Sequence, residues 1–587
     1  MKIEKIHIKG FRNYTDAEIT FQPKTLIIGA NDVGKTNLMY ALRLLFDRSI
    51  SDHELELCDS DYNAYSGADS IEITVTISSI TEECLLSTFG GAIKDGTTII
   101  RYTNSKSGTY NIYNGFSEQT LEEKNQRFYL KRLNMQYVDT NRDLFSFLRY
   151  EHNNLLRIAK ENLSPEEIES DESTIDALQN NLDGINNQIG KLNYISKSLE
   201  SVNTELGEIS VHNLDQAVCF VAGESNVDRL LDNLVLAYSN GNNPLSIGGD
   251  GRNNQIFLAT WISKQHIQES VDHITFYAIE EPEAHLHPHQ QRKLASYIMD
   301  KFDSQVFITT HSPHIASKFN PDCIVRLYSE NKLSFAACSG CSPKIKTVID
   351  EFSYRLNSLS AETFFSDGVF LVEGPSEVIL YSALAHELGL DLDRRNISIL
   401  SVEGIGFKPY VAVCDALNIP WVLRTDNDIF KIPKSKPAKL HYAGISRVIG
   451  IAEICFENTD DLLKYWKEHE SENEWFIDTV NPESVPDIAK KLNEYIRTQV
   501  KRYGLFLSDI DLENDLAKSA MSGDLKEYYD ISDINNLVKS MQNRKAENML
   551  DFLSEKHSKL SLLKEDRICD PLNALILRVE EKTRSKQ

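Results

Sequence analysis

The spacing of hydrophobic residues divides the chain into four regions. In residues 1–150, apolar Ile6 and Ile8 alternate with polar neighbours, which predicts a half-buried strand, and the later segment NLMYALRLLFD has helical periodicity. Residues 151–225 show a helical period, and strand-like runs such as HITFYAI and QVFITTH return in residues 226–345. In residues 346–587, the runs GVFLVE and WVLRTD alternate with helical segments. This alternation predicts a parallel sheet with helices on its faces, and the chain as a whole is predicted to be α/β.

The helical region carries apolar residues at gaps of three or four. This spacing predicts a long amphipathic helix or helical hairpin with a coiled-coil-like seam, although Gly184 and Gly190 weaken it. The seam could pack within one chain or join two chains, and we favour dimerisation. The apolar positions are Ile175, Leu178, Leu182, Ile185, Ile189, Leu192, Ile195, Leu199, Val202 and Leu206.

The composition indicates the cellular compartment of the protein more clearly than it indicates the reaction. The formal net charge of −25 argues against a general nucleic-acid coat but leaves room for a local basic groove. Nine scattered cysteines fit a reducing compartment, and Cys338 and Cys341 in CSGC lack a second pair at zinc-site spacing. No apolar run approaches the ~18 residues of a membrane helix, and the first residues do not resemble a signal peptide. We therefore expect a cytoplasmic protein without a membrane partner.

A glycine-rich turn between a strand and a helix predicts a nucleotide site. The strand TLIIG runs into GANDVGKT at residues 29–36, a complete GxxxxGKT motif that contains Asn31 and Gly34. Such glycines let backbone N–H groups surround phosphates at a helix N-terminus. Lys35 is then expected to reach the β and γ phosphates, and the Thr36 hydroxyl to bind Mg²⁺.

Two later strand ends add polar groups suited to the same site. The strand ITFYAI ends in Glu280-Glu281-Pro282-Glu283, where an acidic side chain could hold Mg²⁺ and the attacking water. The strand VFITT ends at His311, where an imidazole could sense a γ phosphate. These elements resemble the ABC ATPase superfamily, in the branch of RecF and SMC proteins.

That resemblance assigns roles to individual residues. It implies that Glu280 takes the usual Mg²⁺ aspartate position, that Glu281 is the general base and that His311 is the switch histidine. It also places the helical region as a coiled-coil insertion and SIGGDGRNN at 246–254 as the signature loop. His285, His287 and His289 could suggest a metal cluster, but they match the loop after the Walker B strand. Glu280 replaces the usual aspartate, and Gly248 occupies the signature serine position with Ser246 out of register, so ATP binding is better supported than rapid turnover.

Carboxylates after two C-terminal strands predict a second site. The strand GVFLV leads to Glu373 and, four residues on, to Glu377 in the first turn of a helix. The strand WVLRT leads to Asp426 and Asp428, which point to one face of an extended segment. Hard oxygen ligands at neighbouring strand ends suit Mg²⁺ or Mn²⁺, and two such ions could support phosphodiester cleavage. The alternative is that these residues only cap helices and turns.

The pairing of EGPSE with DND resembles the Toprim domain, and after an ABC ATPase it resembles the OLD (overcoming lysogenisation defect) nuclease family along nearly the whole chain. The resemblance implies that acidic residues in IDLENDL, namely Asp511, Glu513 or Asp515, complete the second metal site. It also implies that Lys545 stabilises charge on the scissile phosphate and that the loop VEGIGF at 402–407 lies beside the metals. The strings IEEPE, LVEGPSE, RTDND and SDIDLENDL most resemble nuclease subunits of the Gabija anti-phage system. That likeness implies a homo-oligomer (dimer or tetramer), a UvrD-like helicase partner and nicking of double-stranded DNA.

The sequence thus predicts four regions: a first ATPase part (1–150), a helical insertion (151–225), a second ATPase part (226–345) and a Toprim nuclease domain (346–587). The expected activity is metal-dependent DNA cleavage under control of ATP. An ATP-driven DNA clamp or repair scaffold with a non-catalytic Toprim fold is the alternative. A topoisomerase or a primase would need further domains that the sequence pattern does not indicate. Four lysines after the DND motif could meet DNA phosphates or form a solvated surface. They are Lys431, Lys434, Lys436 and Lys439.

Overall fold

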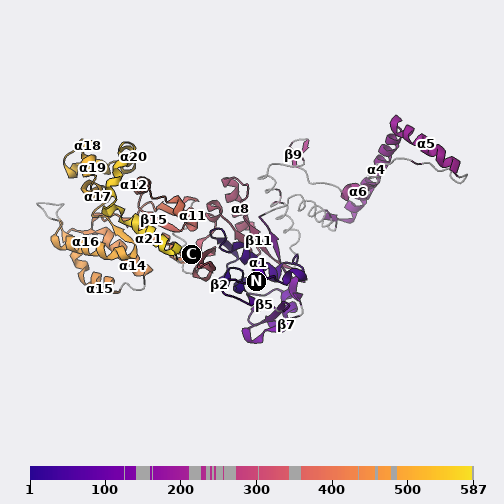
Figure 1. Ribbon diagram of the computed structural model, residues 1–587, viewed down its shortest axis with the longest axis horizontal. Helices are drawn as coiled ribbons and strands as arrows, with labels where there is room; N and C mark the ends of the chain where they lie inside the picture. The colour runs from indigo at the N-terminus through magenta and orange to yellow at the C-terminus, as the bar shows by residue number, and fades with distance from the viewer. Residues whose placement is uncertain are drawn as a thin grey trace. The chain divides into compact units, whose positions relative to one another are not determined.

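The computed structural model (Figure 1) divides the chain into two compact units. It describes residues 1–140, 163–209, 226–232, 238–240, 243–245, 273–342 and 358–584, apart from 107, 125, 302, 434, 436, 457–459 and 478–484, and a few single residues between 141 and 259. The first unit comprises 1–140, 271–283 and 288–587, and the second comprises 141–270 and 284–287.

The first unit begins with an antiparallel sheet of strand order β2-β1-β4-β5-β6-β7. Ile6 and Ile8 of β1 are fully buried, as their alternation with polar residues predicts. Buried side chains of this sheet share one core with those of the second sheet of the unit. The strands are β1 (Lys2–Phe11), β2 (Tyr14–Thr20), β4 (Ser70–Ser78), β5 (Thr98–Ser105), β6 (Asn111–Gly115) and β7 (Glu122–Lys124), with helix α2 at Glu83–Phe89.

The second sheet positions the glycine-rich loop. Its order is β14-β13-β3-β12-β11-β8, and all its strands are parallel except the edge strand β14. Because parallel strands end at one edge, the ends of β3, β11 and β12 bring their following residues together. The strands are β3 (Lys24–Ile28), β8 (Leu133–Val138), β11 (Ile274–Glu280), β12 (Val306–Thr309), β13 (Ile324–Glu330) and β14 (Leu333–Ala336), and the helices are α1 (Lys35–Phe46), α8 (Pro288–Lys301) and α9 (Pro313–Ala316).

The second unit contains the predicted amphipathic helices. Helix α4 (Pro165–Gly190) starts with a capping box, in which Ser164 accepts from Glu167 N, and α5 (Asn193–Ile209) follows after a short break. Gly190 is therefore the last residue of the first helix. Leu178, Ile185 and Val202 are 45%, 51% and 47% exposed, so part of the apolar seam has no cover within the described chain. Dimerisation through these helices stays a prediction. The unit also holds α6 (Val227–Asp232), β9 (Tyr238–Asn240) and β10 (Asn243–Leu245).

The C-terminal part of the first unit confirms the predicted parallel sheet. Its strands are ordered β16-β15-β17-β21 and run parallel: β15 (Gly368–Val372), β16 (Ile397–Ser401), β17 (Trp421–Thr425) and β21 (Leu505–Leu507). The last helix, α21 (Asp570–Arg584), lies against β15, and a Cβ at Gly368 would come 2.5 Å from Val579 Cγ2. Glycine permits this close approach of helix and strand.

Further helices surround this sheet, and several of them share one core with its buried side chains. They are α11 (Ser358–Glu362), α12 (Pro375–Glu387), α13 (Lys408–Ala416), α14 (Ala443–Cys455), α15 (Asp460–His469), α16 (Asp487–Val500), α17 (Leu512–Lys518), α18 (Ser522–Tyr529), α19 (Ile534–Gln542) and α20 (Lys545–Lys556). A small antiparallel sheet, β18 (Ile429–Lys431), β19 (Lys439–Tyr442) and β20 (Glu474–Phe476), starts directly after Asp428. In the described part of the chain, no helix combines the length and apolar character needed to cross a bilayer.

Candidate nucleotide site and candidate nuclease site

The backbone of the glycine-rich loop adopts the glycine-dependent turn that its sequence predicts. Gly29 and Gly34 have φ values of 153° and 98°, which L side chains rarely adopt. A Cβ at Gly29 would lie 2.5 Å from Leu327 O, and one at Gly34 would lie 2.7 Å from Asn13 Nδ2. The loop is therefore held close against neighbouring elements, and α1 begins directly after it.

Lys35 lies inside this loop. The side chain is buried, and Nζ donates to Gly29 O at 3.0 Å and Ala30 O at 2.7 Å. Burial lowers the pKa of Lys35, while the nearby Glu281 and Glu280 oppose that shift. Phosphate oxygens could replace the two carbonyls as acceptors, which is the role predicted for this lysine.

The other predicted nucleotide residues gather at the same sheet edge. Thr36 Oγ1 donates to Glu280 Oε2 at 3.4 Å, and His311 Nε2 lies 3.7 Å from Glu281 Oε1. Burial, reinforced by Asp139, raises the pKa of Glu280. Burial and the charge of Lys35 lower the pKa of His311, which favours the neutral imidazole. The edge thus combines a lysine, a hydroxyl, two carboxylates and an imidazole, while Asn31 lies exposed in the loop.

Glu283 is a supporting residue to which the sequence assigned no role. Its Oε1 accepts hydrogen bonds from Thr310 Oγ1 at 2.6 Å and from His311 N at 2.8 Å. Burial raises the pKa of this carboxyl. Glu283 thereby fixes the backbone that carries His311. The predicted signature loop at 246–254 lies outside the described residues.

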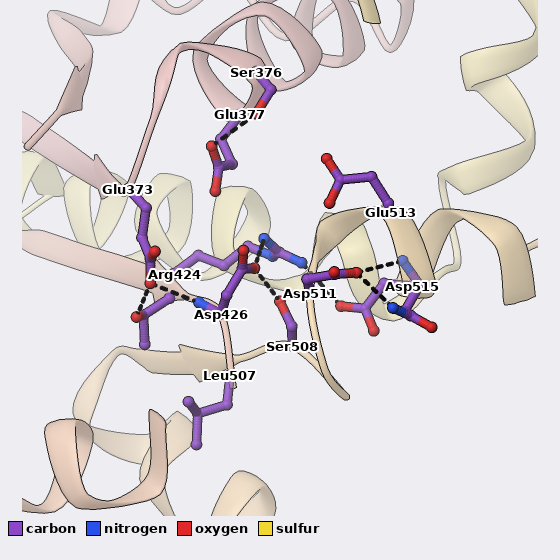
Figure 2. A network of polar contacts seen from close by, with 12 residues as sticks. Glu373, Ser376, Glu377, Arg424, Asp426, Leu507, Ser508, Asp511, Glu513 and Asp515 are labelled. Carbon is purple, nitrogen blue, oxygen red and sulfur yellow. Dashed lines mark hydrogen bonds and ion pairs between the residues drawn. The ribbon is translucent and has the colours of Figure 1, made fainter. Parts of the chain in front are cut away.

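The candidate nuclease site is built at the carboxyl ends of three adjacent parallel strands. Strand β15 delivers Glu373, its neighbour β17 delivers Asp426 and Asp428, and β21 leads to the acidic segment that starts α17. Figure 2 shows Glu373, Glu377, Asp426 and Glu513 around one region at this edge. The sheet topology therefore brings together carboxylates from three distant stretches of sequence.

Glu373 is held by three donors on one oxygen. Its Oε1 accepts from Asp426 N at 2.8 Å, from Arg447 Nη1 at 2.6 Å and from the Thr425 hydroxyl. Arg447 also donates to Thr425 Oγ1 and to Asp426 O, so it links the ends of β15 and β17. These contacts fix the Glu373 carboxylate and leave Oε2 as the oxygen for another partner.

Asp426 is buried among both signs of charge. Ser508 Oγ donates to its Oδ1 at 3.0 Å, while Arg424 Nη1 and Lys545 Nζ lie 3.6 and 3.9 Å from its oxygens. Burial raises the pKa of Asp426 to about 8; Arg424 and Lys545 oppose this, and Glu373 adds to it together with Glu377. The raised pKa means that divalent cations and protons compete for this carboxylate.

Glu377 and Asp428 extend the cluster. Glu377 is buried, and its Oε2 accepts from Gly374 N at 3.1 Å and Ser376 Oγ at 3.2 Å. Burial raises the pKa of Glu377, and burial together with Glu373 raises that of Asp428. The loop at 402–407 lies beside them, because Gly404 N donates to Glu373 O at 2.9 Å.

The three acidic residues of the later motif have different surroundings. Asp511 caps α17, with Oδ1 accepting from Asn514 N at 2.7 Å and Oδ2 from Gln542 Nε2 at 2.5 Å. Asp515 pairs with Arg424 at 2.9 Å. Glu513 is 1% exposed, and Lys545 Nζ lies 3.0 Å from its Oε2. Of the three, Glu513 is best placed to contribute to a metal site, whereas a metal role of Asp511 stays a prediction.

The donor set suits hard divalent cations. The six predicted carboxylates outnumber by two to one the basic side chains that contact them, which are Arg424, Arg447 and Lys545. Neither buried oxygen of Glu513 accepts a hydrogen bond of normal geometry, and its ionic partner among the described side chains is Lys545. As the described side chains stand, no three His, Cys, Asp or Glu residues surround one point closely enough to hold a metal ion. Binding therefore requires rotation of carboxylates within the cluster.

Several residues that contribute to this site could not be recognised from the sequence motifs. Arg447 comes from α14, and Arg424 is buried within β17 between Asp426 and Asp515. Asn427, fully buried between the two aspartates, bonds Asn493 Oδ1 at 2.9 Å and accepts from Ile445 N at 3.1 Å. It anchors α14 against the DND motif. Among the lysines after this motif, Lys439 pairs with Glu474 at 2.8 Å, and Lys434 and Lys436 lie outside the described residues.

The fold and the two sites define an ATPase of ABC type that is joined to a Toprim domain. Residues 24–317 match the family described as AAA domain, putative AbiEii toxin, Type IV TA system. Residues 364–428 match the family described as Overcoming lysogenization defect protein-like, TOPRIM domain.

Two curated relatives are similar to this chain, and one solved structure aligns with part of it. The chain is 26% identical to Endonuclease GajA of Bacillus cereus (strain VD045), over 96% of this chain and 99% of that protein. It is 30% identical to an OLD nuclease of Thermus scotoductus, over 26% of this chain and 31% of that protein. The solved C-terminal region of the Xanthomonas campestris OLD protein aligns with 38% of this chain and all of its own length, at 21% identity and a TM-score of 0.22. The chain belongs to the OLD nuclease family, with an ATPase domain followed by a Toprim domain.

Proposed function

We propose that this nuclease is a metal-dependent DNA endonuclease whose activity is regulated by ATP. The observation that carries the proposal is the gathering of Glu373, Asp426 and Glu513 with Lys545 at one sheet edge. A helix-capping role does not account for Asp426 or for Glu513, because neither accepts a bond from a helix N-terminus in the described structure. The relative named Endonuclease GajA supports the same activity.

Each residue has a definable role in this reaction. Glu373, Glu377, Asp426, Asp428 and Glu513, with Asp511 behind them, would hold two Mg²⁺ or Mn²⁺ ions. Such ions supply an activated water and stabilise the leaving oxygen during phosphodiester hydrolysis. Lys545, beside Glu513 and Asp426, would stabilise the charge that develops on the scissile phosphate. Arg447 holds Glu373 in place for this chemistry.

The biological setting is proposed from the relatives and the sequence pattern. The substrate would be double-stranded DNA, cut in one strand, and the setting anti-phage defence in the cytoplasm. The chain would act as a homo-oligomer through α4 and α5, with a UvrD-like helicase as its partner. ATP would bind at Lys35, Thr36, Glu280, Glu281 and His311.

A DNA clamp is the second candidate, and one comparison favours it. A stretch covering 8% of the chain is 52% identical to the DNA replication and repair protein RecF of a Synechococcus strain. A clamp would use the nucleotide site and bind DNA without cutting it. The carboxylate cluster at the Toprim edge has no role in such a function.

A plasmid assay separates the two functions. We expect supercoiled plasmid to become nicked or linear in Mg²⁺ or Mn²⁺ and to stay intact with EDTA, because the metal ions would supply the activated water and stabilise the leaving oxygen. The product is followed on agarose gels. Slower migration of intact plasmid, without any nicked or linear product in either metal, would support the clamp instead.

A further inference from the structure

A buried arginine of the ATPase sheet contacts the Toprim part of the same unit. Arg326 lies on β13 and is 6% exposed. Its Nη1 donates to Leu417 O at 3.2 Å and Asn418 O at 3.3 Å, and its Nη2 donates to Ser366 O at 2.9 Å. One planar guanidinium therefore binds carbonyl groups of two separate Toprim segments.

These carbonyls lie where the two strands of the nuclease site begin. Ser366 comes two residues before β15, which leads to Glu373, and Asn418 comes three residues before β17, which leads to Asp426. The two strands are hydrogen-bonded neighbours, and Val369 N donates to Pro420 O at 2.9 Å near the same end. Each strand has five residues and therefore spans about 17 Å between the end near the arginine and the end near the carboxylates.

The strand that carries Arg326 also lies next to the glycine-rich loop of the candidate nucleotide site. Strand β13 pairs in parallel with β3, and Arg326 is in register with Ile28, the residue before Gly29. Gly29 itself packs on the next residue of β13, since a Cβ there would lie 2.5 Å from Leu327 O. If the loop shifts when phosphate binds, the backbone of β13 that carries Arg326 would be displaced first.

Neighbouring contacts follow the same route. Helix α9, which follows His311, packs against α11, which precedes Ser366. The ammonium of Lys582 lies 5.4 Å from the ring of Tyr328 on β13 and donates to Asn418 O at 2.5 Å. Helix α9 thus contacts the helix that precedes β15, and β13 is linked through Lys582 to the residue Asn418 that precedes β17.

We propose that Arg326 is the positioning residue through which nucleotide occupancy changes the alignment of Glu373 with Asp426. The inference rests on the proposed function and names the physical link for its regulation. The guanidinium fixes the starts of two strands to one point of the ATPase sheet. A displacement of β13 then moves both strands together and alters the spacing of the carboxylates at their ends.

The test compares Arg326 with an arginine of matched chemistry. Arg578 on α21 donates to Trp421 O at 2.8 Å, at the start of the same strand, but its contacts come from within the Toprim part. Plasmid cleavage rates with and without ATP are measured for full-length wild type, Arg326→Met, Arg326→Lys and Arg578→Met. ATP affinity with and without DNA is measured in parallel, because coupling between two binding sites is reciprocal.

In the wild type, ATP is expected to change the cleavage rate at least about fivefold in one direction, the lower range of allosteric coupling. In Arg326→Met, the cleavage rates with and without ATP should differ by less than about twofold. DNA should no longer change the affinity of this variant for ATP. Arg326→Lys should lose at least about half of the effect, because one ammonium cannot span both segments. Arg578→Met should keep the wild-type ratio even where it melts at a lower temperature.

Wild-type coupling in a folded Arg326→Met variant overturns the inference. If that variant does not fold, wild-type coupling in Arg326→Lys overturns it equally. Cleavage that ATP does not change in the wild type also overturns it, while leaving the nuclease assignment intact. A wild type that cuts no DNA at all instead contradicts the proposed function.

Discussion

Changing Glu373 to glutamine is expected to abolish DNA cleavage. The substitution keeps the side chain's size but removes the negative charge at the point where Thr425, the Asp426 amide and Arg447 converge. Loss of a partner that only orients a metal ligand already costs ~10–100-fold in affinity or activity, and the loss of a ligand should cost more. The rate of plasmid cleavage at saturating Mn²⁺ measures the effect. Asp426→Asn should behave in the same way.

Glu387→Gln is the matched control for this prediction. Glu387 is the last residue of α12, the helix that starts beside Glu373, and lies about 18 Å along its axis from Pro375. It should cut at the wild-type rate. Cleavage within about tenfold of wild type by both Glu373→Gln and Asp426→Asn, less than the loss of a metal ligand should cost, would remove these residues from the catalytic machinery.

Changing Lys545 to methionine is expected to lower the turnover rate by ~10²–10³-fold, as for the loss of one group that stabilises transition-state charge. Although burial lowers its pKa, Glu513 and Asp426 raise the pKa of Lys545 more strongly, so the ammonium stays charged. Metal affinity should not weaken, since the change removes a positive charge from the cluster. Single-turnover cleavage and Mn²⁺ titration calorimetry separate the two effects.

Lys556→Met serves as the comparison, because Lys556 ends the same helix and contacts only Glu527 among the acidic side chains described. Its turnover rate should be unchanged. Equal rates for Lys545→Met and wild type would show that Lys545 only balances the charge of Glu513.

The parts of this site that could be predicted from sequence are those whose signal is local. EGPSE and DND each follow an apolar strand, and parallel strands place such residues at one edge. The α/β fold and the parallel C-terminal sheet were predictable because strand-like and helical segments alternate along residues 346–587. The gathering of Lys35, Glu280 and His311 was predictable for the same reason, because each lies at or after the end of a strand of one sheet.

The remaining parts depend on packing between distant segments. Arg447 reaches Glu373 only because Asn427 and Gly444 let α14 dock closely on the DND loop, where a Cβ at Gly444 would lie 2.5 Å from Asp426 O. Spacing alone could not separate Glu513 from Asp511, since capping of α17 by Asp511 depends on where that helix begins. In the sequence, Arg326 is an ordinary residue of a predicted strand. Its contacts with Leu417 and Ser366 become evident only in the folded structure.

The central claim is that the carboxylates of the Toprim edge bind divalent cations. Crystals of the full-length protein soaked in Mn²⁺ and measured at the manganese absorption edge test it most directly. We predict anomalous peaks between Glu373, Asp426 and Glu513, and their loss in Glu373→Gln. Peaks only at the nucleotide loop, with none at this edge, would contradict the account.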